Sequence, residues 1–104
     1  MKKMVVLLIN EKNSDSIRKS VVETFSDRDV SFCEPLTKGK LTFEEMIDYD
    51  YVQNYVDKHE FTHILVSGVT VLNIFVSLAA RIKFGKIGLL VHNRDTNRHE
   101  ELFI

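Results

Sequence analysis

The amino-acid sequence predicts an α/β fold: a small Rossmann-like three-layer sandwich whose sheet is mainly parallel, with an antiparallel C-terminal edge strand. Three observations predict it. Short apolar runs are continuous rather than alternating, which is typical of strands covered on both faces. Segments with helical spacing of apolar residues separate these runs, and such alternation indicates right-handed crossovers with helices on both faces of the sheet. The 104 residues carry no repeat, linker or low-complexity run, so we expect 1–104 to be a single domain.

The first part of the chain predicts a strand, a helix and a second strand. Residues 4–9 are apolar throughout and form the first strand. A polar loop follows, and residues 16–25 place their apolar side chains on one face of a helix. Residues 26–29 turn the chain, and residues 30–33 form the second strand, which ends before Pro35.

A capping box opens the second helix. Thr42 and Glu45 stand three residues apart, the spacing at which each side chain bonds to the backbone N–H of the other residue. The helix that they open can reach His59. Aspartates weaken its middle, so a break near Asp50 is the alternative.

The last part of the chain predicts a strand, a helix, a strand and a returning edge strand. Residues 62–67 form the third strand and residues 70–83 the third helix, with Gly85 as its C-terminal cap. Residues 86–92 form the fourth strand. Turn-forming residues follow, and residues 98–104 return as an antiparallel edge strand.

In a sheet of this kind, ligands bind at the edge where the carboxyl ends of the parallel strands meet. Polar residues follow each predicted strand at that edge. We therefore expect a ligand-binding edge made of Asn10, Glu11, Lys38, Lys40, Ser67, Gly68, Thr70 and Asn93.

The turn between the third strand and the third helix is a candidate anion site. Free backbone N–H groups and the helix dipole favour negative charge there, and Gly68 lets a ligand approach the backbone closely. Ser67 or Thr70 can donate to a phosphate oxygen. The alternative is that Ser67 or Thr70 only caps the helix and Gly68 only makes the turn. The turn matches neither a P-loop nor a GxGxxG motif, so it predicts neither ATP nor a dinucleotide.

Residues 92–99 (HNRDTNRH) form the densest polar cluster of the chain and follow a buried strand directly. Arginine binds phosphates in a bidentate manner, and histidine transfers protons near neutral pH. The catalytic candidates are therefore His92, Arg94, Arg98 and His99. The alternative is an exposed hairpin tip that is rich in turn-forming residues and carries solvated arginines.

The third helix carries apolar side chains around most of its circumference between Val69 and Phe84. One face packs on the sheet, and the other needs a further cover. We therefore expect a homodimer that buries this helix. The alternative is that the second helix or the chain ends cover it.

Composition and charge narrow the classes of function. A formal net charge of −1 argues against coating of duplex nucleic acid. Cys33 is the one cysteine, so no internal disulfide can form. No HxH, HExxH or CxxC spacing occurs, and we expect neither a metal nor a cofactor. No apolar stretch suits a signal peptide or a bilayer span, so we expect a cytoplasmic protein that does not bind membranes.

A resemblance to a known family rests on the block around Ser67-Gly68-Val69-Thr70. The block resembles the CARF (CRISPR-associated Rossmann-fold) domains, in which the strand before the last crossover helix ends in a small motif rich in Gly, Ser and Thr. The minimal size is similar to stand-alone CARF-type ring nucleases, which destroy the cyclic oligoadenylate messengers of type III CRISPR antiviral defence. The family's motif often has a second glycine and a lysine, where this sequence has valines. Phosphate contacts would then come from Lys38, Lys40, Arg94 or Arg98.

The resemblance implies a homodimer that binds a symmetric cyclic oligonucleotide across its two-fold axis. It also implies metal-independent cleavage, in which the ribose 2′-hydroxyl attacks the adjacent phosphate and leaves a 2′,3′-cyclic phosphate. Ser67 and Thr70 would orient phosphate oxygens, an arginine of residues 92–99 would stabilise negative charge, and a histidine there would protonate the leaving oxygen. The expected activity is thus a ring-nuclease hydrolase. Two alternatives stay open: a non-catalytic sensor or sponge for a nucleotide messenger, and a structural or interaction subunit that docks through the third helix.

Overall fold

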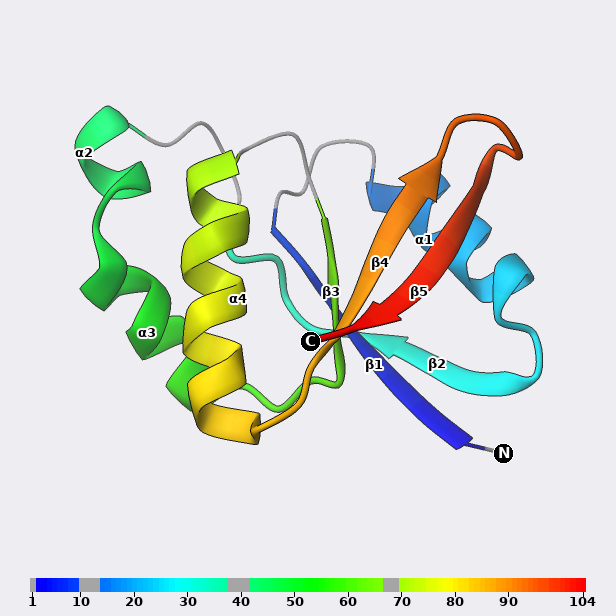
Figure 1. The fold of residues 1–104 in the computed structure, drawn as a ribbon, viewed down its shortest axis with the longest axis horizontal. Coiled ribbons are helices and arrows are strands. Elements are labelled where there is room, and N and C mark those ends of the chain that lie inside the picture. The colour runs from blue at the N-terminus through cyan, green and yellow to red at the C-terminus, as the bar shows by residue number, and fades with distance from the viewer. Residues whose placement is uncertain (1, 10–13, 38–41, 67–69) are drawn as a thin grey trace.

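Five strands form one mixed sheet with helices on both sides, as the computed structural model shows (Figure 1). The structure describes residues 2–9, 14–37, 42–66 and 70–104. In chain order the elements are β1 (Lys2–Leu8), α1 (Ser14–Thr24), β2 (Arg28–Phe32), α2 (Phe43–Met46), α3 (Tyr49–Lys58), β3 (His63–Leu65), α4 (Thr70–Phe84), β4 (Gly88–Asn93) and β5 (Arg98–Phe103).

The strand order β2-β1-β3-β4-β5 confirms the predicted Rossmann-like α/β class. β1 pairs in parallel with β2 and β3, and β3 pairs in parallel with β4. β5 returns antiparallel to β4 at the edge of the sheet, as the sequence predicted. The register places Val6, His63, Gly88 and Phe103 in one row across β1, β3, β4 and β5.

The side chains of β1 alternate between two cores because successive residues of a strand point to opposite faces. Met4, Val6 and Leu8 pack in the core that α1 covers, together with Val21 and Phe25. Every one of these side chains is buried. This face of the sheet therefore depends on a single helix for its cover.

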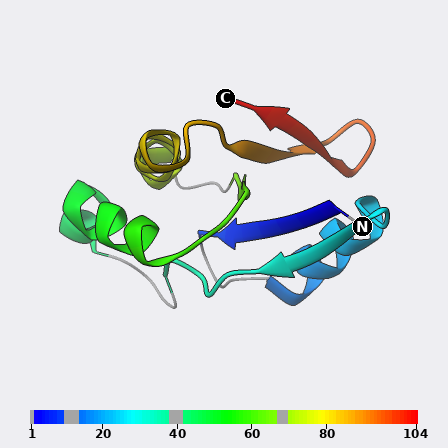
Figure 2. The ribbon, with the colours of Figure 1, turned by 90° about the horizontal axis from the view of Figure 1, so that it is seen from below.

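The opposite face of the sheet carries the larger core, under α3 and α4. Leu7 and Ile9 continue the β1 segment on this side and pack with Val52 of α3 and Val76 of α4. Figure 2 shows α3 and α4 on one side of the sheet and α1 on the other. The structure thus has the three layers that the continuous apolar run of β1 predicted.

The helix predicted after the capping box is two helices. α2 is a single turn opened by the predicted box of Thr42 and Glu45, and α3 follows after a short break. The Asp48 carboxylate accepts the Tyr51 N–H at 3.3 Å and so caps α3. The expected alternative of a break near Asp50 is confirmed: the break lies at Ile47 and Asp48, because an aspartate stabilises the start of a helix more than its interior.

Most strand boundaries differ from the prediction by one or two residues: β1 begins at Lys2 rather than Met4, and β4 begins at Gly88 rather than Lys86. The turn expected over residues 26–29 is wrong in its second half, because β2 already begins at Arg28, which pairs with Lys2. Arg28 and Asp29 belong to the strand because their backbone pairs with that of β1, and this pairing outweighs their low intrinsic strand propensity. β3 covers only 63–65 of the expected 62–67.

α4 follows the predicted helix to within one residue, and Gly85 caps it with a φ of 79°, as expected. α3 covers one flank of α4, where Tyr49 meets Phe75 edge to face with ring centroids 5.5 Å apart. The expectation that the second helix could cover the third therefore holds for that flank. No helix among the described residues is long and apolar enough to cross a membrane.

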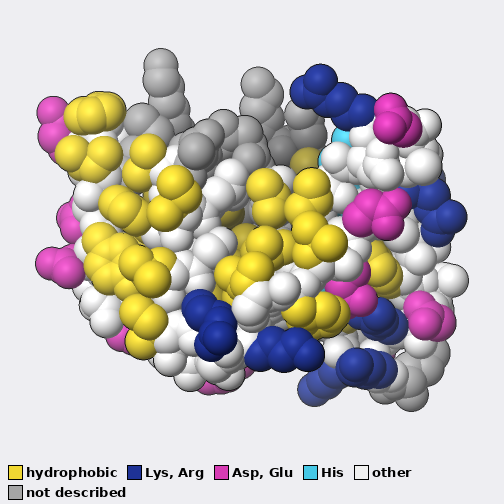
Figure 3. Space-filling view, viewed as in Figure 1, with side chains coloured by type: hydrophobic (Ala, Val, Ile, Leu, Met, Phe, Trp, Pro, Cys, Tyr) yellow, Lys and Arg dark blue, Asp and Glu magenta, His cyan; other side chains and the backbone are white. Residues whose placement is uncertain are grey.

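The outer flank of α4 keeps a stripe of exposed aliphatic side chains at helical spacing: Val71, Ile74, Leu78 and Ile82, with exposed fractions of 37%, 58%, 50% and 71%. We call this set the α4 stripe. Figure 3 shows hydrophobic side chains gathered over α4 and, beside it, over the end of the C-terminal strand. A patch of this kind is typical of a surface that another molecule covers.

Asp48→Ala should lower the free energy of unfolding by about 1 kcal/mol, because the first turn of α3 loses its cap. Urea denaturation followed by circular dichroism measures this. Asp50→Ala is the matched control, since that exposed carboxylate also lies in the first turn of α3 but is not the cap, so its loss should have a smaller effect. Equal losses in the two variants would contradict the assigned cap.

Candidate functional site

The predicted ligand edge lies at the carboxyl ends of the parallel strands, at the top of the molecule in Figure 1. Thr70 is the first residue of α4, where the prediction placed the start of the helix. The remaining members of the predicted strand-to-helix turns lie outside the described residues: Asn10, Glu11, Lys38, Lys40, Ser67 and Gly68.

The predicted polar cluster forms the β4–β5 hairpin. His92 stands directly opposite His99, and their ring centroids lie 5.4 Å apart. His92 Nε2 is 3.0 Å from Asn97 Oδ1, and Asn97 has a left-handed φ of 55°. The Asp95 N–H donates to Asn93 Oδ1 at 2.9 Å. The hairpin tip therefore combines turn-forming residues with a pair of imidazoles that hold a fixed position.

The alternation along β4 and β5 separates the members of this cluster. His92 and His99 form one cross-strand pair, and Asn93 and Arg98 form the next pair, which points to the opposite face of the ribbon. Arg94 lies in the turn. Both arginines are exposed, and neither forms an ion pair within the described part of the chain.

His99 is the most constrained of the predicted catalytic residues. It lines a cavity of about 470 Å³ between the end of α1 and β5, and Arg98 lines the same cavity. Burial, with a smaller contribution from His92, lowers the pKa of His99. Its Nδ1 atom is buried without a hydrogen-bond partner among the described residues. A neutral imidazole of this kind is suited to accept a proton.

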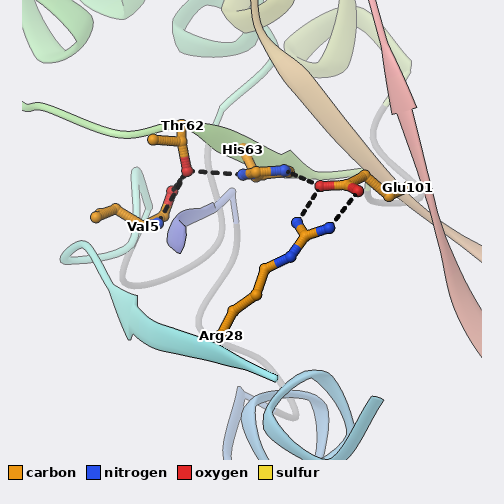
Figure 4. Close-up of polar contacts among 5 residues, drawn as sticks. All are labelled: Val5, Arg28, Thr62, His63 and Glu101. Carbon is orange, nitrogen blue, oxygen red and sulfur yellow. Dashed lines mark hydrogen bonds and ion pairs between the residues drawn. The ribbon is translucent and has the colours of Figure 1, made fainter. Parts of the chain in front are cut away.

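A second polar centre lies at the opposite, amino edge of the sheet (Figure 4). His63 Nε2 is 2.6 Å from Glu101 Oε2, and the Thr62 hydroxyl is 2.7 Å from His63 Nδ1. The Arg28 guanidinium binds both oxygens of Glu101, with the Nη2–Oε1 contact at 2.8 Å. We call these four residues the amino-edge network; it joins side chains of β2 and β5 with Thr62 and His63 at the start of β3.

The network satisfies both ring nitrogens of His63 in the neutral state. With the proton on Nε2, the ring donates to Glu101, and Nδ1 can accept the Thr62 hydroxyl, which alternatively donates to the Val5 carbonyl at 3.2 Å. The Val5 N–H in turn donates to Thr62 Oγ1 at 2.9 Å. Burial is the main cause that lowers the pKa of His63, against the opposing effect of Glu101.

Glu101 stays ionised because of its partners. The Arg28 guanidinium lowers the pKa of this carboxyl to about 2, and the hydrogen bond from His63 acts in the same direction. The same pairing raises the pKa of Arg28. The hydroxyl–imidazole–carboxylate chain is thus a fixed arrangement, and both acid–base side chains have pKa values below their ordinary range.

Gly88 makes room for this arrangement. A Cβ atom at this position would lie 2.3 Å from His63 Cδ2 and 2.6 Å from its Nε2, too close for any side chain. The imidazole therefore rests directly against the backbone of β4.

The amino-edge network was not predicted from the sequence. His63 was not among the expected site residues, and Arg28 was placed in the turn over residues 26–29. The one local signal was a glycine at the start of a buried strand, which indicates close approach of another group. The pairing itself spans 73 residues between Arg28 and Glu101 and leaves no local pattern.

Neither Cys33 nor a metal-ligating cluster contributes a further reactive site among the described residues. The half-buried Cys33 thiol donates to the Glu60 carbonyl at 3.5 Å, and burial raises its pKa, so it is a poor nucleophile. Across residues 2–9, 14–37, 42–66 and 70–104, no group of three His, Cys, Asp or Glu side chains could hold a metal ion.

Glu101→Gln should lower the free energy of unfolding at pH 7 by about 2 kcal/mol, because a carboxyl whose pKa falls from 4.5 to about 2 on folding is stabilised in its charged form. That stability is present above pH 4.5 and is lost as the pH falls toward 2. The difference between wild type and variant should therefore narrow on acidification, as urea denaturation from pH 7 to pH 3 would show.

The neighbouring substitution Glu100→Gln is the matched control. Glu100 is exposed and has only a long contact, 3.5 Å, with Asn93 Nδ2. A loss equal to that of Glu101→Gln, or a gap that does not change with pH, would contradict the role of the Arg28–Glu101 pair.

Comparison with known proteins adds no family to this geometry. No family model, no curated protein and no solved structure matches the chain significantly. The function is therefore inferred from the fold and from the polar residues at the two edges of the sheet.

Proposed function

We propose that this chain binds a cyclic oligoadenylate messenger as a homodimer, at the carboxyl edge of its sheet, and cleaves the ring without a metal. The observation that carries the proposal is the β4–β5 hairpin. It holds a histidine pair and two exposed arginines that form no ion pair with any residue the structure describes, at the edge where folds of this class bind ligands. Arginines in this state are free to contact phosphates.

The chemistry that fits these residues is intramolecular phosphoryl transfer. The 2′-hydroxyl of one ribose attacks the adjacent phosphorus, the P–O5′ bond breaks, and a 2′,3′-cyclic phosphate results. Neutral His99 would accept the 2′-hydroxyl proton, and an arginine of the hairpin, Arg94 or Arg98, would stabilise the developing negative charge. His92 would return a proton to the leaving 5′-oxygen.

The dimer part of the proposal is supported by the α4 stripe. Four exposed aliphatic side chains lie on one flank of a helix, and α3 already covers the other flank. A second copy of the same stripe would give a self-complementary interface, as a two-fold axis requires. Such a dimer would present two hairpins to one ring.

A non-catalytic messenger sensor is the second candidate. It is favoured by the alternation along the hairpin, which points the Asn93–Arg98 pair to the face opposite the two histidines. The arginines can bind phosphates without a histidine nearby, whereas cleavage requires an arginine and a histidine at the same phosphate. In this case the ring would be retained intact.

The purified protein should convert radiolabelled cyclic tetra- or hexaadenylate into linear products with a 2′,3′-cyclic phosphate in the presence of EDTA. Arg94→Ala combined with Arg98→Ala should reduce ring binding at least tenfold, because two phosphate contacts are lost. His99→Ala should reduce cleavage more than binding. Thin-layer chromatography and filter binding measure the two quantities.

Lys58→Ala, at the exposed end of α3, is the control for unspecific loss of charge. Binding without cleavage of the ring would contradict the ring-nuclease proposal and favour the messenger sensor. No binding of any ring, or binding unchanged in the double arginine variant, would contradict the hairpin site.

The protein should be a dimer in light scattering, and Ile74→Glu combined with Leu78→Glu should make it a monomer, because two charges would be buried in the interface. Val22→Glu on α1 is the control, since Val22 is also exposed but lies on the other side of the sheet. A wild-type monomer would contradict the dimer. A dimer that binds no cyclic oligoadenylate would favour a structural or interaction subunit.

A further inference from the structure

A cavity of about 380 Å³ opens at the amino edge of the sheet, the edge opposite to the hairpin tip. Lys2, His63 and Gly88, the first residues of β1, β3 and β4, line it, together with Glu101 and Phe103 of β5. The amino-edge network thus forms part of the wall of an open cavity rather than the inside of a closed core.

Positive charge dominates the rim of this cavity. Lys2, Lys3 and Lys86 line it and are exposed, and none of them has a carboxylate partner among the residues that the structure describes. Arg28 also lines the cavity, with a side chain that is 20% exposed, but Glu101 balances its charge, so it contributes N–H donors rather than net positive charge.

The two carboxylates of the cavity do not offset these lysines, because each is already paired. Glu101 is bound by Arg28 and His63. Glu60 lies 3.4 Å from Lys83, which is not part of the lining. The lysine ammonium groups therefore remain available for an anion from outside.

Three aromatic rings line the same cavity. Phe61 and Phe84 meet edge to face with ring centroids 5.1 Å apart, and the Phe103 ring lies 5.7 Å from His63. Lys86 Nζ stands 4.6 Å from the centroid of the Phe103 ring, so a cation and an aromatic surface are presented side by side. Cavities that bind small molecules typically combine such apolar walls with a few polar groups.

The network also explains how the site would stay open and ordered without a ligand. The partly buried Arg28–Glu101 pair contributes less to stability than apolar side chains of the same volume would contribute if they filled the cavity. The bidentate contact with Glu101 fixes the Arg28 guanidinium, which still has N–H groups beyond those that bind the carboxylate. A donor that is already held in place loses little entropy when a ligand binds.

We propose that this cavity binds a small organic anion that carries an aromatic ring. Lys2, Lys86 and Arg28 contact the anionic group, and Phe61, Phe84 and Phe103 contact the ring. The proposal does not rest on the messenger site, because the residues that contact the two ligands differ, although Glu101 lines both this cavity and the one beside His99.

Titration with phenyl phosphate, followed by amide chemical shifts in NMR, tests the proposal. Saturable shift changes are expected at Lys2, His63, Gly88 and Phe103, and not in the hairpin at 92–99. Inorganic phosphate should bind at least tenfold more weakly, because it buries no apolar surface. Phenol should also bind at least tenfold more weakly, because it lacks the charge.

Lys2→Gln combined with Lys86→Gln should weaken the binding of phenyl phosphate at least tenfold. The control pair is Lys19→Gln with Lys58→Gln, which removes the same charge from exposed positions of α1 and α3. Because all four lysines are exposed, both double variants should keep the amide spectrum of the folded protein. Equal weakening in both pairs, equal binding of inorganic phosphate, or shift changes confined to the hairpin would overturn the proposal.

Discussion

The burial of β1 on both faces is the constraint on which this structure depends. From Met4 to Leu8 its residues are apolar without alternation, so each face of the sheet needs its own layer of helices. The chain meets this need with α1 on one side and with α3 and α4 on the other. These crossovers keep β1, β2, β3 and β4 parallel, and they thereby collect the polar strand ends at two separate edges.

Local sequence patterns were sufficient for most of the fold. Continuous apolar runs located the central strands, and the helix over 70–83 and its glycine cap were evident from composition and spacing. The break between α2 and α3 was harder to place, because both Asp48 and Asp50 are poor helix-interior residues and only the hydrogen bond to Tyr51 distinguishes the cap. The start of β2 at Arg28 could not be predicted, because residues 26–29 are polar and only their pairing with β1 makes part of them a strand.

The candidate sites were predictable to different degrees. The hairpin cluster could be found because its residues are adjacent in sequence and a turn joins them. Which side chains share a face depends on the register of β4 and β5, and the sequence does not reveal that His92 pairs with His99. The amino-edge network was beyond sequence reasoning, since three strands supply it and its members look ordinary one by one.

The span of the Arg28–Glu101 pair has a consequence for how the protein folds. Its residues are 73 positions apart and belong to the strands at the two edges of the sheet, so β1, β3 and β4 must be assembled before the pair can form. Contacts of such high sequence separation are costly in loop entropy and form late. The pair therefore contributes little to the speed of folding and mainly slows unfolding, which makes it a determinant of the lifetime of the native state.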